Sequence, residues 1–190
     1  MKQKEPSFLE QLLTRLAFAL FGKRVYRDFA ERLTLKSTDV VLDFGSGIGT
    51  VAYYAAQRIP QGHLVCADVS GRWRRACEKT LRRFSNVSYV LLDADYDALP
   101  SGFDVIYCHF VLHELNHAEL DCAIARFENR LNEGGRLVFR EPLSESAKLS
   151  LVKRLLEQSG MKLQESRIRD IPYMGNVLES IYRKTERRHL

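Results

Sequence analysis

The chain has 190 residues, of which 45% are hydrophobic and 28% charged, and its net charge at pH 7 is +5. This length suits one compact α/β domain, and the composition excludes a disordered or fibrous chain. The basic excess gathers at 72–83 and in the tail at 183–188. Such charge runs are usually solvated helix faces, although they also serve to bind nucleic acid or anionic lipid.

The first apolar run lies at 8–21 and carries leucines at helical spacing. It is shorter than the about 20 apolar residues of a transmembrane helix, and it contains Arg15. No small-residue cleavage site follows it, which disfavours a signal peptide. We therefore predict an amphipathic helix within an N-terminal helical cap at 1–35, for which contact with a membrane surface is one candidate role.

The chain has four cysteines, and no two of them form a C-x-x-C pair. Cys66 and Cys108 lie inside apolar runs that are typical of strands. This pattern indicates reduced, mostly buried thiols and predicts a cytoplasmic protein without a disulfide framework.

The most informative stretch, 40–51, has the sequence VVLDFGSGIGTV. It predicts a buried strand at 40–44, a turn made by three glycines, and a helix at 50–59. Glycine allows positive φ there and lets a ligand approach the backbone. The final glycine of the dinucleotide fingerprint is replaced by Thr50, and no Gly-Lys-Ser/Thr tripeptide occurs, so NAD and phosphate ligands are disfavoured.

The motif D-F-G-S-G-I-G at 43–49 resembles the glycine loop of class I S-adenosylmethionine-dependent methyltransferases, a family with a seven-stranded Rossmann-like fold. In that family the loop wraps the methionyl part of the cofactor, whose positive charges suit a nearby carboxylate. A turn with purely structural glycines is the alternative. The resemblance implies S-adenosylmethionine as the cofactor, and it assigns to its site Asp43, Gly45, Ser46, Gly47 and Gly49.

Two further acids follow predicted strands. A strand at 63–68 ends in Asp68, and this acid resembles the one with which the family binds the cofactor ribose. The following residue, Val69, is assigned to the same site. A surface or helix-capping role is the alternative for Asp68. A strand at 87–93 ends in Asp93, and the resemblance assigns Asp93 and the following Ala94 to the adenine. Asp95 competes for the role of Asp93, and a polar turn is the alternative there.

A fourth strand is predicted at 103–108, and the following C-H-F-V-L-H-E-L resembles the family's loop beside the transferable methyl group. His109 and His113 bring acid–base chemistry to this predicted site, so we predict both as candidate catalytic residues. The resemblance also places His109 at the cofactor. A packing or capping role is the alternative for His113.

His113 and His117 also complete an H-E-x-x-H pattern, which binds zinc when both histidines share one helix face. However, Asn116 and Glu119 predict a capping box at the start of a helix that runs to 131. Because His113 then lies outside the helix, zinc hydrolysis is disfavoured and we predict no metal.

The remaining chain completes an α/β pattern. The segment 131–142 predicts a helix end, a glycine turn at Gly134 and Gly135, and a fifth strand; it resembles the family's Leu-x-x-Gly-Gly-x-Leu. A helix at 147–159 and strands at 162–168 and 177–183 follow; the resemblance implies that the last strand is antiparallel, which the short connection between these strands allows. Together the elements at 36–190 predict a doubly wound, mostly parallel seven-stranded sheet flanked by helices, with ligands at the carboxyl ends of the strands.

The resemblance covers 36–184 and implies a methyltransferase. Methyltransferases of nucleobase amines carry an Asn/Asp-Pro-Pro-aromatic motif where this chain has C-H-F-V at 108–111, so a small-molecule acceptor is favoured. We expect its pocket to be closed by the N-terminal helices and by 141–144 and 171–175. An RNA methyltransferase that uses the basic segment 72–83, a non-catalytic cofactor-binding module and a zinc hydrolase are the alternatives.

Overall fold

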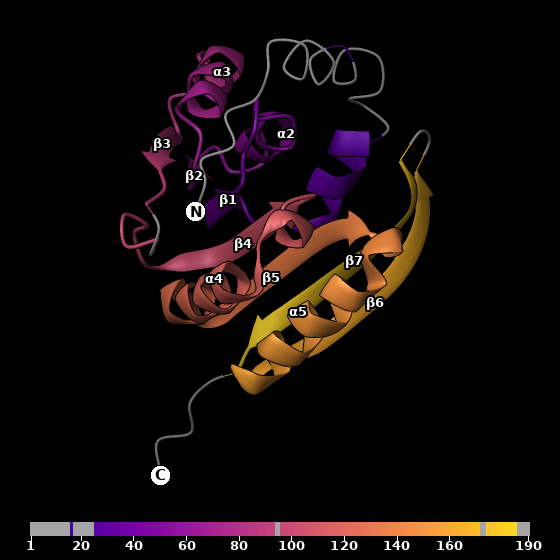
Figure 1. Cartoon of the computed structure of the whole chain (residues 1–190). Helices are drawn as coiled ribbons and strands as arrows, with labels where there is room; N and C mark the ends of the chain where they lie inside the picture. Colours follow the sequence, from indigo (N-terminus) through magenta and orange to yellow (C-terminus); the bar gives the residue numbers. More distant parts are fainter. Residues whose placement is uncertain (1–15, 17–24, 94–95, 172–173, 186–190) are drawn as a thin grey trace. The chain divides into compact units, whose positions relative to one another are not determined.

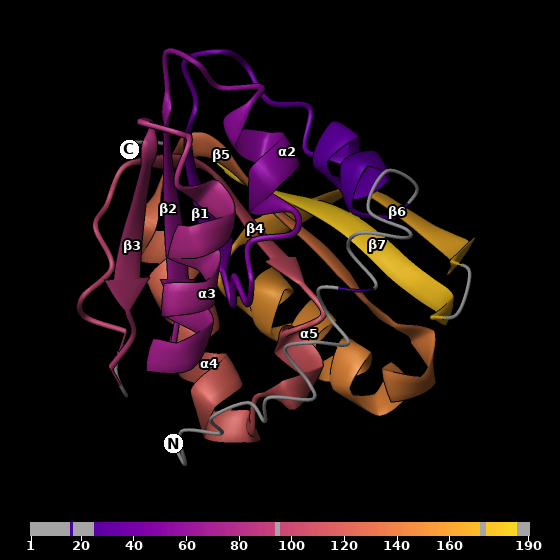
Figure 2. The same cartoon turned by 90° about the horizontal axis from the view of Figure 1, so that it is seen from above.

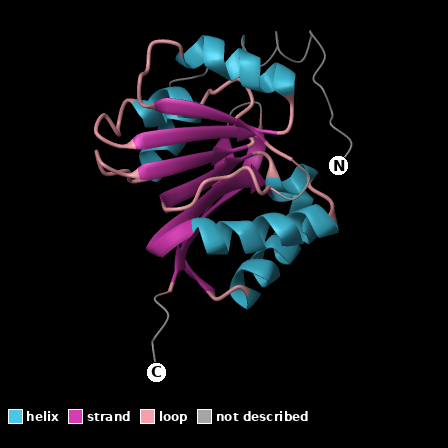
Figure 3. Cartoon of the chain, turned by 90° about the vertical axis from the view of Figure 1, so that its left-hand side faces the viewer, coloured by secondary structure: helices cyan, strands magenta, loops and turns pink. Residues whose placement is uncertain are grey.

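The computed structural model describes residues 16, 25–93, 96–171 and 174–185. Its seven strands follow the order β3-β2-β1-β4-β5-β7-β6 in one sheet (Figure 1). The strand pairs are parallel except that β7 runs antiparallel to β5 and β6. Helices flank the strands (Figure 3). This arrangement confirms the predicted fold class. The chain divides into two compact units, 1–99 and 100–190, and each is described by itself.

The first unit contains three parallel strands: β1 Val40–Phe44, β2 His63–Asp68 and β3 Val87–Leu91. The side chains of β1 and β2 are almost all buried, which explains their continuous apolar runs. The third strand is shorter than the predicted 87–93, because Asp93 accepts a hydrogen bond from the amide of Asp97 and starts a turn.

Two helices of the first unit, α2 Ala52–Ala56 and α3 Gly71–Leu81, lie next to each other beside the strands (Figure 2). The predicted helix at 50–59 is too long: Thr50 is still part of the glycine turn, and Pro60 disfavours helical backbone at the residue before it. The predicted helix 8–21 lies outside the described residues except for Leu16, which is 48% exposed. Within the predicted cap, a helix at 25–32 buries apolar side chains, among them Phe29.

The second unit contains β4 Phe103–His109, β5 Leu131–Pro142, β6 Met161–Ile171 and β7 Gly175–Lys184. Helices α4 His117–Arg130 and α5 Ser146–Gln158 pack against each other. The hairpin of β6 and β7 extends beyond the predicted strands at both ends, since the pairing continues to Gly175. Among the described residues, no helix is both long and apolar enough to cross a membrane.

The glycine pair at the start of β5 is placed differently from the prediction. The structure places Gly134, at φ 73°, inside β5, where the register with β4 shifts. A Cβ built on Gly135 would lie 2.8 Å from the carbonyl oxygen of Asn132. The glycines therefore serve a bulge in a strand, because the strand pairing starts directly after α4.

A buried ion cluster connects three strands of the second unit. Glu179 is fully buried, and its two carboxylate oxygens accept hydrogen bonds from Arg140 at 2.7 Å and from Arg167 at 2.7 Å. The arginines lower the pKa of Glu179 against the opposing effect of burial. An unpaired charge at this depth would be costly, so the cluster fixes the pairing of β5, β7 and β6.

Candidate active site

All three glycines of the turn after β1 have left-handed backbone, as the sequence predicts: φ is 76° at Gly45, 53° at Gly47 and 80° at Gly49. The turn is tied to the end of β2, because the amides of Gly45 and Ser46 both donate to the carbonyl oxygen of Ala67, at 2.8 and 3.0 Å. Only glycine adopts this series of angles readily.

Two of these glycines are required for different reasons. A Cβ built on Gly47 would meet nothing within 4 Å, so this residue faces open space. A Cβ built on Gly49 would lie 2.9 Å from Sγ of Cys77 and 3.3 Å from Leu81, both on α3. Gly49 therefore lets α3 pack against the turn, whereas the backbone at Gly47 stays open to close approach.

Asp68, at the carboxyl end of β2, holds this turn. It is 6% exposed, and one carboxylate oxygen accepts the amide of Gly47 at 2.9 Å while the other accepts the amide of Ser70 at 2.9 Å. The N-cap of α3 is Ser70, which accepts the amide of Trp73, so the helix-capping alternative for Asp68 is wrong.

The other predicted cofactor residues of the first unit differ in how deeply they are buried. Asp43 and Ser46 are buried, and Val69 is half-buried. Asp93 is exposed, and one of its carboxylate oxygens accepts the amide of Asp97 at 2.9 Å, as in the polar-turn alternative. Ala94 and Asp95 lie outside the described residues. The adenine contacts thus stay a prediction.

In the second unit, one buried carboxylate organises the loop after β4. Glu141 is fully buried, and its Oε1 accepts the amides of Val111 at 2.9 Å and Leu112 at 2.8 Å. Its Oε2 lies 2.5 Å from Nδ1 of His113. Because a carboxylate only accepts, Nδ1 carries the proton and Nε2 of His113 keeps its lone pair. The His113 side chain is 22% exposed, so this imidazole is oriented and still accessible.

The pKa values of the two predicted catalytic histidines are shifted in opposite directions. The hydrogen bond to Glu141 raises the pKa of His113 above 6.5, against the effect of burial, and the charges of Glu141, Glu114 and Glu145 add to the rise. Burial and then the charge of Arg140 lower the pKa of His109 well below 6.5. His109 is therefore neutral at pH 7, whereas His113 keeps its proton to a higher pH than an ordinary imidazole does.

The zinc-like pattern is divided between two elements. His113 lies in the short 3-10 helix η1 Leu112–Glu114, and α4 starts only at His117. The capping box that separates them is formed as predicted, with Asn116 and Glu119 bonding to each other's amides at 2.9 and 3.0 Å. Within the described part of the chain, no group of three or more His, Cys, Asp or Glu residues could hold a metal ion.

Glu141 is the residue that the sequence prediction missed, since 141–144 was expected only to line a pocket. It lies 28 residues from His113. The available signal was an acid at the carboxyl end of an apolar strand, directly before Pro142. In the same unit, a cavity of about 400 Å³ lies between α5 and the neighbouring strands, and Leu143 of that predicted pocket wall lines it.

Comparison with known sequences finds proteins that are similar to this chain. Residues 42–137 match the family model described as a methyltransferase domain. The chain is 29% identical over 167 residues to an uncharacterized methyltransferase of Bacillus mycoides strain KBAB4, covering 82% of this chain and 74% of that protein. A similar uncharacterized methyltransferase of Bacillus cereus strain ATCC 14579 is 28% identical over the same length.

Solved structures share the fold at lower identity. A SAM-dependent methyltransferase from Aquifex aeolicus has a TM-score of 0.72 at 17% identity, covering 90% of this chain and 96% of that chain. The N-methyltransferase NodS from Bradyrhizobium japonicum WM9, in complex with S-adenosyl-L-homocysteine, has a TM-score of 0.70 at 22% identity, covering 87% and 88%.

Proposed function

The chain belongs to the methyltransferase domain family and uses S-adenosylmethionine, and from this premise we propose that it methylates a hydroxyl or amine of a small molecule, with His113 as the proton acceptor. The observation that carries this proposal is the buried Glu141, whose Oε2 lies 2.5 Å from Nδ1 of His113. An oriented imidazole with a raised pKa is the group that a protic acceptor requires.

The glycine turn and Asp68 form the cofactor side of the proposal. Gly47 leaves open space at a backbone that Asp68 holds, and a carboxylate beside this turn is a suitable acceptor for the hydroxyls of a ribose. Asp43 is the buried acid that suits the cofactor's positive charges. When bound, the cofactor supplies an electrophilic methyl group, so the protein's tasks are orientation and the removal of one proton.

His113 takes that proton. The bound cofactor would supply its methyl group to the acceptor's oxygen or nitrogen and would keep the electron pair of the methyl–sulfur bond on its sulfur. The acceptor's proton passes to Nε2 of His113, and Glu141 stabilises the imidazolium that results. General-base catalysis of this kind is typically worth about 10²–10⁴-fold in rate.

His109 has a different task in this proposal. Its lowered pKa makes it a weak proton acceptor, so we assign it the predicted contact with the cofactor rather than the base. The small-molecule acceptor follows from the C-H-F-V sequence at 108–111, which lacks the Pro-Pro pair of nucleobase-amine enzymes. The free cysteines, of which Cys66, Cys77 and Cys108 are buried, support the cytoplasm as the compartment.

The first experiment is calorimetric titration with S-adenosylhomocysteine. We expect micromolar binding by the wild type, a loss of at least tenfold for Asp68→Ala, and no change for Asp121→Ala, an exposed acid on α4 that serves as the charge-matched control. A screen of hydroxyl and amine acceptors with a labelled methyl group follows. Absence of binding by the wild type would overturn the cofactor assignment, and binding without transfer to any acceptor would support a non-catalytic module.

A further inference from the structure

The positive charge of the chain is concentrated in one helix. The segment 71–84, which contains α3, has one acidic residue, Glu78, and a net charge of +5, equal to that of the whole chain. The remaining residues are therefore neutral in sum. The six basic residues of this segment are Arg72, Arg74, Arg75, Lys79, Arg82 and Arg83.

The other basic region that the sequence shows, near the carboxyl terminus, is used inside the fold where the structure describes it. Lys184 is 8% exposed, and its Nζ donates to the carbonyl oxygens of Glu128 at 2.7 Å and Leu131 at 2.9 Å. Arg183 donates to the carbonyl oxygen of Gly134 at 3.1 Å. These cations stabilise the second unit, which leaves α3 as the basic surface to be explained.

The basic side chains of α3 form a stripe along one side. The opposite side is apolar and packs against β2 and β3 through Ala76, Cys77 and Leu81. At about 100° per residue, the spacing of 3, 4 and 3 residues keeps four cations within an arc of about 80° and a length of about 15 Å. The members of this basic stripe are Arg72, Arg75, Lys79 and Arg82, and all four are exposed.

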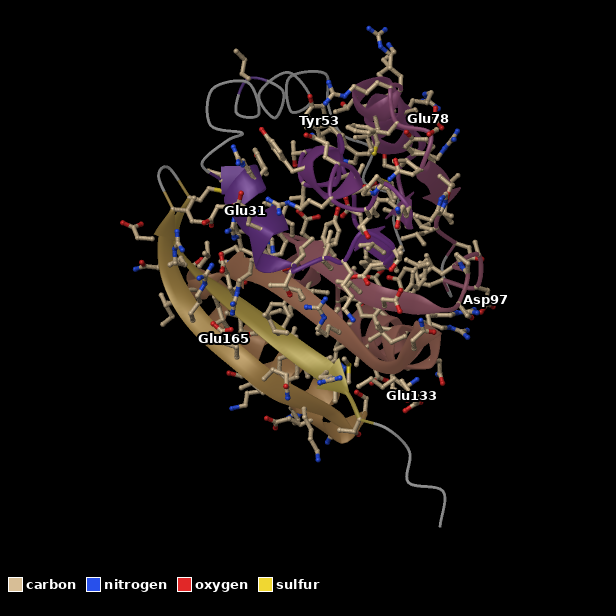
Figure 4. All side chains as sticks on the ribbon, turned by 180° about the vertical axis from the view of Figure 1, so that it is seen from behind. Glu31, Tyr53, Glu78, Asp97, Glu133 and Glu165 are labelled. Carbon is tan, nitrogen blue, oxygen red and sulfur yellow. The ribbon has the colours of Figure 1, made fainter. Side chains whose placement is uncertain are left out.

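Within the part of the chain that the structure describes, three cations of the basic stripe have no ion-pair partner. Glu78, labelled in Figure 4, pairs with Arg74, which is not a member of the stripe. Among the described residues, Arg75, Lys79 and Arg82 form no ion pair. Like charges at this spacing destabilise a helix, so the stripe does not serve the stability of α3.

An aromatic cluster lies beside the carboxyl end of the basic stripe. The guanidinium of Arg83 lies over the ring of Tyr53, 4.5 Å from its centroid, and 4.9 Å from that of Phe84. Both rings are half-buried, and their centroids are 5.6 Å apart. Basic side chains next to aromatic rings are typical of surfaces that bind single-stranded nucleic acid.

We infer that the basic stripe binds single-stranded RNA through its phosphates, independently of sequence. Each of the four cations of the stripe can neutralise one phosphate of a flexible strand, so the stripe offers about three to four phosphate contacts. Guanidinium groups also bind phosphates in a bidentate manner. A membrane surface is disfavoured, because the apolar side of α3 packs against strands and leaves no apolar face for insertion.

The test is the salt dependence of binding to a fluorescein-labelled, unstructured RNA of about 12 nucleotides, followed by anisotropy. For the wild type we expect log Kobs to fall with log salt at a slope of about −2 to −3, from about three to four phosphate contacts. In the triple variant Arg75→Gln, Lys79→Gln, Arg82→Gln, the slope should become less negative by about 2. Its affinity at about 50 mM salt should fall by about tenfold or more. For Lys79→Gln alone, the slope should become less negative by about 0.7.

A second triple variant provides the matched control. Lys153→Gln, Arg154→Gln and Lys162→Gln remove the same charge from exposed positions of the second unit and should keep the wild-type slope. Both triple variants should bind S-adenosylhomocysteine as the wild type does, which shows that they are folded. The inference fails if the wild type binds RNA without salt dependence, if both triple variants lose binding equally, or if anionic phosphatidylserine vesicles bind the stripe while RNA does not.

Discussion

The two chemical centres of this chain are built in opposite ways. The glycine turn of the first unit is held mainly by backbone contacts, with the amides of Gly45 and Ser46 on one carbonyl oxygen and Asp68 closing the loop. The centre in the second unit depends on one buried side chain, Glu141, which holds both the loop backbone and His113. The first centre is thus distributed over several backbone bonds and Asp68, whereas the second depends on a single carboxylate.

The largest effect is expected for His113→Gln. This change removes the proposed proton acceptor and keeps a polar side chain of similar size, so kcat/KM should fall about 10²–10⁴-fold. Binding of S-adenosylhomocysteine should stay within about twofold of the wild type. The measurement is single-turnover methyl transfer to the acceptor that the screen identifies. A variant with wild-type turnover would remove His113 from the mechanism and leave the methyltransferase assignment intact.

Glu141→Gln should lower kcat/KM nearly as much as His113→Gln does. The change keeps the size of the side chain, so it tests whether Glu141 positions the proton of His113 or only packs in the loop. The carbonyl oxygen of the substituted side chain still accepts the amides of Val111 and Leu112, so its NH2 group faces His113. An NH2 donor turns Nδ1 into an acceptor and moves the proton to Nε2, which blocks the base. NMR titration should show the pKa of His113 lower than in the wild type, because the hydrogen bond that raises it is lost.

A purely structural role for Glu141 predicts a different result. The variant would then lose thermal stability, while the acid limb of its pH–rate profile would coincide with that of the wild type. Glu141→Asp, which keeps the charge but shortens the side chain, should recover part of the wild-type pKa of His113 and part of the activity.

The contrast between the two centres also explains what the sequence could predict. The strands at 40–44 and 63–68, the glycine turn and the Asn116 capping box are local patterns, and the structure confirms them. Each depends on residues within about ten positions, where backbone geometry dictates the residue type. The fold class follows from the order of such elements.

The Glu141 contact could not be read in the same way. It joins residues 28 positions apart, and the acid is buried only because the loop amides and His113 satisfy it together. Composition at 141–144 gives no indication of that burial. The glycine pair after α4 was misplaced for a related reason: the bulge at Gly134 depends on the register of the neighbouring strand, which the local sequence does not contain.

Within the glycine turn, two substitutions should separate stability from binding. Gly49→Ala should lower the free energy of unfolding by about 1–3 kcal/mol, because its Cβ would meet Cys77 and its φ is positive. Gly47→Ala has only the backbone strain, about 1 kcal/mol, yet its Cβ would project into the open space proposed for the cofactor. Denaturant unfolding and calorimetry of both variants should show opposite rankings: Gly49→Ala less stable, Gly47→Ala weaker in binding.

The smallest expected effect is on the pH dependence of the free energy of unfolding. His113 affects it above pH 6.5 and His109 below pH 6.5. The pKa of His113 is raised in the folded state, so its contribution is fully present below 6.5 and is lost as the pH rises through the raised pKa. The pKa of His109 is lowered in the folded state, so the unfolded chain binds more protons below 6.5 and stability falls as the pH drops there. Between about pH 5 and 8, these two groups therefore give a maximum of stability near 6.5.

Single variants should each remove the fall in stability on one side of the pH maximum. Thermal unfolding across the same pH range should show that Glu141→Gln removes the decline above 6.5, because the shift of His113 depends first on Glu141. His109→Gln should remove the decline below 6.5, where burial and Arg140 keep the wild-type imidazole neutral. Loss of both sides in either variant would mean that the two histidines titrate as one coupled system, and the separate roles assigned to them would then have to be merged.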